Sequence, residues 1–116
     1  MDERMLAQRV IEVLEERKAE DIVVIDLSEV SIPTSYFVVA TADNTVHAKA
    51  LTNALRGGVS QRPRHSEGMT DRKWIVMDYG DIVVHIFDRD ARDFYDISSL
   101  WADRIVDRSC LEEQNV

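Results

Sequence analysis

The stretch MDYGDIVVHIF, residues 77–87, predicts a β-hairpin with an acidic turn. Gly80 and Asp81 would form a two-residue turn, because glycine accepts the positive φ that such a turn requires. In that register Tyr79 lies opposite Ile82. A three-residue turn would instead shift one strand by one side-chain period and exchange its two faces. The turn length therefore decides which side chains share a face.

With the two-residue turn, the two faces of the hairpin differ in chemistry. Side chains alternate along a strand, so one face carries Ile75, Met77, Tyr79, Ile82, Val84 and Ile86. The other face carries Trp74, Val76, Asp78, Val83, His85 and Phe87. The first face is uniformly apolar and should be core. The second is too apolar to face water alone, yet it holds an ionisable pair, so we expect either a helix or another chain to cover it.

Helical and strand periodicity alternate through the amino-terminal half of the chain. A first amphipathic helix is indicated by apolar residues at the spacing of one helical face, namely Leu6, Val10, Val13 and Leu14. Residues 21–27 and 36–41 are short, β-branched or aromatic, and apolar on both faces, which is typical of strands covered on both sides. The segment between them contains Pro33 and several hydroxyl side chains, and it should be a loop.

A second helix is predicted after these strands, with Asp43 or Asn44 as its N-cap and Gly57 as its end. Its apolar side would carry Val46, Ala50, Leu51, Ala54 and Leu55. The segment 59–73 is polar and irregular, with one short edge strand expected before Glu67. After the hairpin, a short helix should pack onto the sheet through Phe94, Tyr95, Ile97, Leu100 and Trp101.

The order of these elements predicts one α/β domain. A chain of 116 residues can bury one core but not two independent ones. We expect residues 1–103 to form a mixed β-sheet flanked by helices. Apolar residues become sparse after this point, so residues 104–116 should form a polar, flexible carboxyl-terminal tail.

The charge balance bears on the kind of partner. The chain has 22 acidic and 14 basic residues, a net charge of -8, so direct contact with nucleic acid should be minor. An acidic surface favours encounter with a basic protein, although acidity alone can serve only to keep a protein soluble. No run of about 18 apolar residues and no secretion signal are found, and Cys110 has no second cysteine to pair with. We therefore expect a cytoplasmic protein without a membrane span.

Enzyme chemistry has little support in the sequence. Phosphate-binding glycine loops, nucleophile motifs and paired cysteines are missing, and the three histidines are far apart. His85 alone would ordinarily be a partly buried strand residue. The alternative is a small Mg²⁺-dependent nucleotidyl- or phosphoryl-transfer enzyme, because Asp88 and Asp90 stand at i and i+2 on a strand end. We expect no enzyme activity, no cofactor and no metal.

Several motifs in one order resemble the Iojap family, whose bacterial members are ribosomal silencing factors. The similarity covers residues 18–101, from KAEDIVVIDL through YFVVATADNTVHAKALTNAL to WIVMDYGDIVVHIFDRDARDFYDISSLW. Its most specific parts are 19–21, 36–38, 78–81, 84–87 and 94–96, the last followed by Leu100-Trp101.

The resemblance implies a fold similar to nucleotidyltransferases without their catalytic motif. It also implies a homodimer in isolation that binds ribosomal protein L-fourteen on the large subunit. Bound there, it would block joining of the small subunit and lower translation when nutrients are scarce, while organellar relatives assist large-subunit assembly.

Applied to this chain, the resemblance predicts a partner-binding surface and no catalytic residues. Its members would be Trp74, Asp78, Tyr79, Asp81, His85, Phe87 and Trp101. Trp74 and Phe87 would be apolar anchors, and Asp78 and Asp81 would face basic groups. Tyr79 is the weakest member, since the hairpin register turns it to the core. Tryptophans such as Trp74 and Trp101 are more often core residues than interface hot spots, and the apolar patch could be buried in the protein's own dimer.

Overall fold

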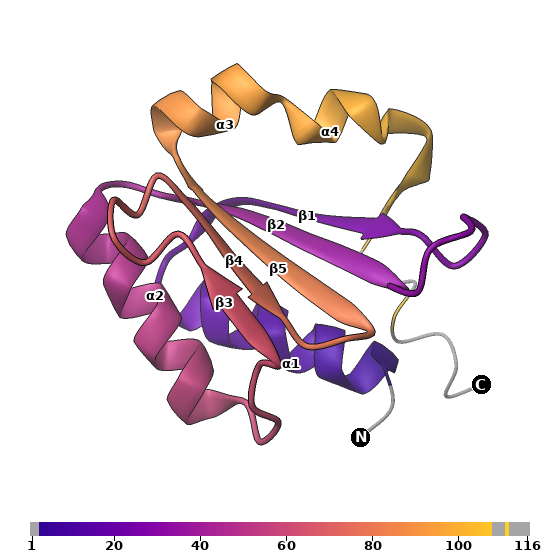
Figure 1. The fold of residues 1–116 in the computed structure, drawn as a ribbon, viewed down its shortest axis with the longest axis horizontal. Helices are drawn as coiled ribbons and strands as arrows, with labels where there is room; N and C mark the ends of the chain where they lie inside the picture. Colours follow the sequence, from indigo (N-terminus) through magenta and orange to yellow (C-terminus); the bar gives the residue numbers. More distant parts are fainter. Residues whose placement is uncertain (1–2, 108–110, 112–116) are drawn as a thin grey trace.

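The computed structural model describes residues 3–107 and 111 as a six-stranded mixed sheet between helices (Figure 1). The elements in chain order are α1 (Glu3–Glu16), β1 (Glu20–Asp26), β2 (Tyr36–Ala42), α2 (Thr45–Gly58), β3 (His65–Glu67), β4 (Trp74–Asp78), β5 (Ile82–Asp88), α3 (Arg89–Tyr95), α4 (Ile97–Leu100), the 3-10 helix η1 (Ala102–Arg104) and β6 (Ile105–Val106). This confirms the predicted α/β class.

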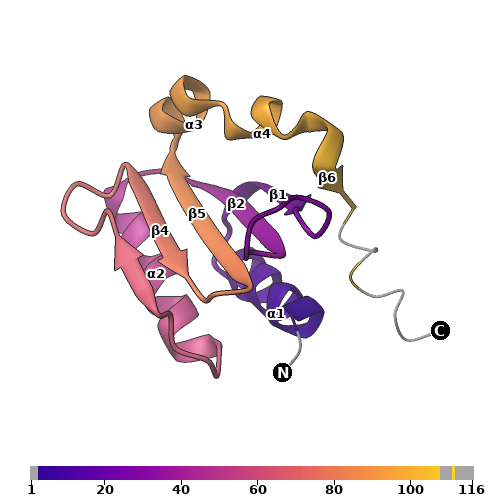
Figure 2. The ribbon, with the colours of Figure 1, turned by 45° about the vertical axis from the view of Figure 1, so that its right-hand side comes forward.

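The strand order of the sheet is β3-β4-β5-β2-β1-β6. β2 and β5 are parallel, and every other neighbouring pair is antiparallel. Helices α1 and α2 cover one face of the sheet, and α3 and α4 lie across the other (Figures 1 and 2). β5 is thus the third strand from one edge and has partners on both sides, so its two faces meet different helix pairs.

The hairpin of β4 and β5 has the predicted two-residue turn. The Tyr79 backbone N–H donates to the Ile82 carbonyl at 2.8 Å, and Met77 pairs with Val84. Gly80 has a φ of 92°, which confirms the need for glycine at this position. All six residues of the predicted core face are buried, so this part of the prediction is confirmed.

The face under α1 and α2 holds the larger core. The predicted inward residues of α1 are all buried there, with Leu14 and Val10 fully enclosed. Asn44 is the N-cap of α2, and its side chain accepts a hydrogen bond from the His47 backbone N–H at 2.8 Å. The predicted inward side of α2 was wrong in part, because Val46 is 75% exposed and Ala50 is exposed as well. The buried stripe runs instead through Ala48, Leu51, Thr52 and Leu55, which follow the i, i+3, i+4, i+7 spacing.

The carboxyl-terminal part differs most from the expectation. Asp96 adopts a left-handed conformation with a φ of 41° and divides the predicted helix into α3 and α4. Phe94 and Leu100 are therefore 80% and 73% exposed rather than packed. β6 pairs with β1, so the sheet extends past the boundary predicted at residue 103. The buried Leu111 contacts the main core, and the rest of the expected tail lies outside the described residues.

Candidate partner-binding surface

The second face of the hairpin is covered only in part. We call the set Trp74, Val76, Asp78, Val83, His85 and Phe87 the hairpin face. Phe87 is fully buried in a second core cluster together with Ala91 of α3. Trp74 stacks on Phe87 with ring centroids 5.0 Å apart and contacts Tyr95 at 4.6 Å. α3 therefore covers one end of this face, while Val76 and Asp78, nearer the turn, are half-buried.

A hydrogen bond between two ring side chains fixes the middle of the hairpin face. The Trp74 Nε1–H donates to Nδ1 of His85 at 3.0 Å. Because indole nitrogen only donates, His85 accepts at Nδ1 and carries its proton on Nε2. That Nε2 is buried and has no partner among the described residues. Burial lowers the pKa of His85 to about 4, so the ring is neutral near pH 7.

The acidic turn carries one structural and one exposed carboxylate. Asp78 Oδ1 accepts the Gly80 backbone N–H at 2.7 Å, which stabilises the turn. The Asp81 carbonyl accepts the backbone N–H groups of Ser35 and Tyr36, at 2.8 and 3.1 Å, and so ties the turn to the start of β2. The Asp81 side chain is exposed and pairs with no cation in the described part of the chain. It is available to an external basic group.

Three of the predicted contact residues are not on the open part of the hairpin face. Tyr79 is 2% exposed on the opposite, core face, and burial raises the pKa of its hydroxyl. Phe87 is enclosed beneath Trp74 and Tyr95, so it supports the surface from below instead of acting as an anchor. Trp101 follows α4 and is half-buried against the second core cluster, where it makes no ring contact with Trp74, His85 or Phe87.

Two aromatic residues of this surface were missed by the sequence analysis or assigned to the core. Phe37 of β2 meets the His85 ring edge to face with centroids 4.6 Å apart. Tyr95 of α3 contacts both Trp74 and Phe87. Only the parallel pairing of β2 with β5 brings Phe37 beside Val83, and no local pattern reveals that pairing. The aromatic pair Phe94-Tyr95 was a visible signal, but it was read as core packing.

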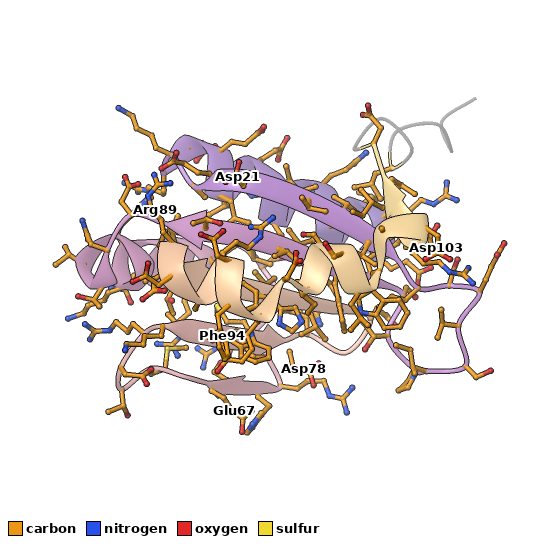
Figure 3. All side chains as sticks on the ribbon, turned by 90° about the horizontal axis from the view of Figure 1, so that it is seen from above. Asp21, Glu67, Asp78, Arg89, Phe94 and Asp103 are labelled. Atoms are coloured by element: carbon orange, nitrogen blue, oxygen red, sulfur yellow. The ribbon has the colours of Figure 1, made fainter. Side chains whose placement is uncertain are left out.

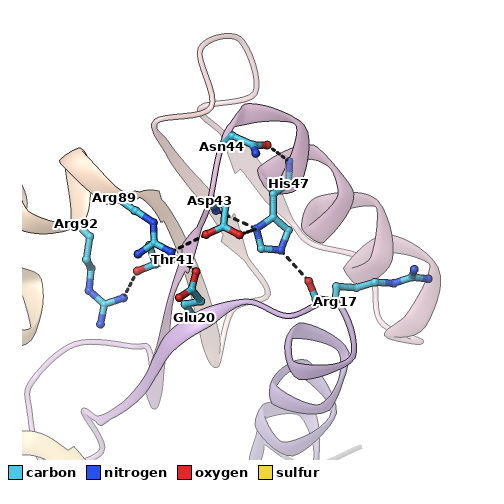
Figure 4. Close-up of polar contacts among 8 residues, drawn as sticks. All are labelled: Arg17, Glu20, Thr41, Asp43, Asn44, His47, Arg89 and Arg92. Carbon is cyan, nitrogen blue, oxygen red and sulfur yellow. Dashed lines mark hydrogen bonds and ion pairs between the residues drawn. The ribbon is translucent and has the colours of Figure 1, made fainter.

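A separate polar cluster joins the ends of β2 and β5 near α1 (Figure 4). The Arg89 guanidinium donates to Asp43 at 2.6 Å and also to Glu20. The hydrogen bond between the two carboxyls raises the pKa of Glu20 and lowers that of Asp43. His47 Nδ1 accepts the Asp43 backbone N–H at 2.9 Å, so its Nε2 donates to the Arg17 carbonyl 2.7 Å away. These contacts connect separate elements and account for the cluster as a structural feature.

A model of the family described as "Ribosomal silencing factor during starvation" matches residues 1–115. The chain belongs to this family, RsfS. It is 35% identical over 105 residues to the ribosomal silencing factor RsfS of Treponema pallidum, and the alignment covers 88% of this chain and 95% of that protein. It is 28% identical to an Iojap-related mitochondrial protein of Arabidopsis thaliana, covering 88% of this chain and 59% of that protein. The predicted family is thus confirmed.

Solved structures agree with the RsfS assignment. A crystal structure of a Chromobacterium violaceum protein superposes with a TM-score of 0.83 at 33% identity, covering 88% of each chain. A Bacillus halodurans structure at 24% identity, with a TM-score of 0.78 over 90% of this chain and 98% of that one, shows the same fold. The RsfS relatives of Bacillus subtilis and Treponema pallidum are both named as ribosomal silencing factors.

The geometry of this RsfS-family chain also removes the basis of the alternative interpretation, in which Asp88 and Asp90 form a magnesium pair on one strand. Asp88 ends β5 and caps α3, where its Oδ1 accepts the Ala91 backbone N–H at 2.7 Å. Asp90 lies in the first turn of α3, so the two carboxylates do not extend from one strand. Within residues 3–107 and 111, no group of three or more histidine, cysteine or carboxylate side chains could hold a metal ion. Among the same described residues, the helices fall short of the length and hydrophobicity that a membrane span requires.

The buried histidine predicts a stability change in acid. Burial lowers the pKa of His85 from its ordinary value of 6.5 to about 4. Between pH 4 and 6.5 the folded state therefore binds fewer protons at this ring than the unfolded state does. The free energy of unfolding should therefore be unaffected by this group above about pH 6.5 and should fall as the pH drops towards 4, by roughly 3 kcal/mol in all. Urea unfolding across this range should show the loss in the natural chain and a smaller one in His85→Gln. Parallel pH curves for the two proteins would contradict it.

Proposed function

We propose that this RsfS-family protein binds ribosomal protein L-fourteen on the large ribosomal subunit and blocks joining of the small subunit. Translation would fall when nutrients are scarce, and the protein would act in the cytoplasm. We also propose that it assists large-subunit assembly. The observation that carries the proposal is the hairpin face, where half-buried apolar groups lie beside the exposed Asp81 carboxylate. The names of the relatives support the ribosomal setting.

The chemistry of the hairpin face suits a basic protein better than RNA. Trp74 and Val76 are half-buried and can each lose further surface to a partner. Asp81 and the net charge of -8 attract basic groups and repel a phosphate backbone. Because Trp74 is already held by His85, little freedom is lost when a partner packs on it. These properties support a protein contact on a ribosomal surface.

Steric block of subunit joining requires only that the bound protein occupy space on the joining face of the large subunit. The described chain measures 40 by 30 by 23 Å. Contacts between two subunits need atoms within a few ångströms, so a body of this thickness on the joining face keeps the two surfaces apart. Neither a bond-making step nor a cofactor is needed for this action.

We further propose that the free protein is a homodimer. Exposed apolar side chains between α4 and β6, namely Leu100 and Ile105, supply area outside the hairpin face that a second copy could bury. If the dimer also used the hairpin face, subunit binding would have to compete with dimerisation. Sedimentation of the protein with and without large subunits would reveal whether the dimer persists in the complex.

The proposed function is tested by co-sedimentation. The protein should pellet with isolated large subunits and not with assembled ribosomes, and it should prevent added small subunits from joining. Binding to assembled ribosomes with equal strength, or unimpeded joining, would contradict occlusion.

Asp81→Lys should lower the association rate with large subunits by about tenfold at low salt and weaken its salt dependence, because an exposed charge acts mainly on encounter. Glu12→Lys makes the same charge change on α1, across the sheet from the hairpin face, and serves as the matched control. Stopped-flow association kinetics at several salt concentrations measure both. Equal slowing by the two variants would show that only net charge matters and would remove Asp81 from the site.

A further inference from the structure

A groove of about 600 Å³ opens beside the hairpin face. One side is formed by α3, and the other by the loop between β3 and β4, including Gly68 and Lys73. Seen from above the sheet, the labelled Phe94 projects from α3 towards the strands at this edge (Figure 3). Trp74 lines the groove and also belongs to the hairpin face, so the two surfaces are continuous.

One wall of the groove is aromatic. Trp74 and Tyr95 lie with ring centroids 4.6 Å apart, and Tyr95 meets Phe94 nearly perpendicularly at 5.0 Å. Phe94 is 80% exposed and Tyr95 is 50% exposed, so much of their ring surface faces solvent. Since the Trp74 N–H is already bonded to His85, its indole is fixed in place. Exposed aromatic rings attract cations through the negative potential above each ring face.

The other lining groups make the groove acidic. Asp71, Asp88 and Asp90 line it together with a single cation, Lys73. Asp71 Oδ1 accepts the Lys73 backbone N–H at 3.2 Å, and Asp88 Oδ1 accepts that of Ala91 at 2.7 Å, so each carboxylate also serves the backbone. The Asp90 side chain is exposed and forms no hydrogen bond or ion pair with the residues that the structure describes. Three carboxylates against one ammonium favour a cationic occupant.

Carboxylates beside partly exposed aromatic rings fit one cationic group best. A guanidinium is planar, stacks on aromatic faces and pairs with carboxylates through two parallel hydrogen bonds, whereas an ammonium does neither as well. We infer that the groove between α3 and the β3–β4 loop binds an arginine side chain on an exposed segment of the basic protein that occupies the hairpin face. This inference rests on the proposed function for the identity of the partner, and on the groove alone for the arginine.

Binding of an arginine side chain to the groove can be tested first on the free protein. Acetyl-Gly-Arg-Gly-amide, titrated into ¹⁵N-labelled protein, should shift the Trp74 indole signal and the amides of α3 in a saturable way. The lysine peptide should bind at least about threefold more weakly, and the citrulline peptide, which has the shape without the charge, should leave the signals unchanged. Equal shifts with arginine and citrulline, or none with either, would overturn the inference.

Variants locate the binding within the groove. Asp90→Asn and Phe94→Ala should each weaken the arginine peptide at least about threefold, and both positions are exposed, so folding is not at stake. Asp93→Asn removes the same charge from the same helix, but Asp93 lines a different hollow together with Asp21 and Arg92. This variant should bind the arginine peptide as tightly as the natural chain does. Equal weakening by Asp93→Asn would overturn the assignment to this groove.

Large subunits distinguish this inference from the proposed function. The double variant Asp90→Asn/Phe94→Ala should bind isolated large subunits about tenfold more weakly than the natural chain does. If the natural chain binds them and the double variant binds as tightly, the arginine inference falls and the proposed function stands. If the natural chain takes the arginine peptide but does not bind large subunits, the proposed function falls and the groove remains an arginine site.

Discussion

Phe87→Ala is expected to lower the free energy of unfolding by about 3–5 kcal/mol, the range found when a buried aromatic side chain is truncated. The ring is fully buried between the sheet and α3, where it stacks on Trp74 and contacts Tyr95. Its loss leaves a cavity directly beneath the surface that we assign to partner binding. Because small domains are stable by only about 5–15 kcal/mol, the change should be obvious in a urea or thermal unfolding curve.

Phe94→Ala is the matched control for this result. It is the same chemical change seven residues later in the chain, at a side chain that is 80% exposed. Surface substitutions of this kind usually alter stability by no more than about 0.5 kcal/mol. Similar losses in the two variants would show that α3 does not enclose Phe87 in the way described.

Trp74→Ala should weaken binding to isolated large subunits by about 30-fold or more, equivalent to at least about 2 kcal/mol for an interface hot spot. The indole contributes to both the hairpin face and the groove, and His85 holds it in one orientation. Its removal therefore takes away apolar contact area and leaves His85 Nδ1 without its donor. Equilibrium binding to large subunits, with circular dichroism to confirm folding, measures the effect.

Trp74→Phe separates the two contributions of this residue. Phenylalanine keeps an aromatic ring over Phe87 but cannot donate to His85, so a partial loss of affinity is expected. The double variant Trp74→Ala/Asp81→Lys combines loss of the anchor with reversal of the exposed charge. If a folded form of that double variant still captured large subunits at full strength, the hairpin face would not be the binding site.

The hairpin could be predicted in detail because everything that specifies it is local. Alternating side chains define two faces, and Gly80 with Asp81 defines the turn, so the register through Tyr79 and Ile82 followed from eleven consecutive residues. The same reasoning placed Tyr79 on the core face, against its inclusion in the predicted site, and the structure agrees with the geometry.

What covers the second face could not be predicted, because it depends on distant parts of the chain. Phe37 reaches His85 only through parallel pairing of β2 and β5. The segment FYDISSLW reads as one helical stripe, but the left-handed Asp96 breaks the stripe and turns Phe94 and Leu100 outward. β6 is two residues long, too short to give a strand pattern. Local periodicity carries no information about any of these.

The edge of the sheet at β3 limits how copies of this protein can associate. β3 is three residues long, and its outward-facing His65 and Glu67 side chains pair with each other at 3.3 Å while remaining mostly exposed. A short edge with exposed polar side chains, one of them the Glu67 carboxylate, is a poor template for a strand from another molecule. Edge-to-edge aggregation through β3 is therefore disfavoured. A dimer that includes β3 would have to form through side-chain contacts and not through a continuous sheet.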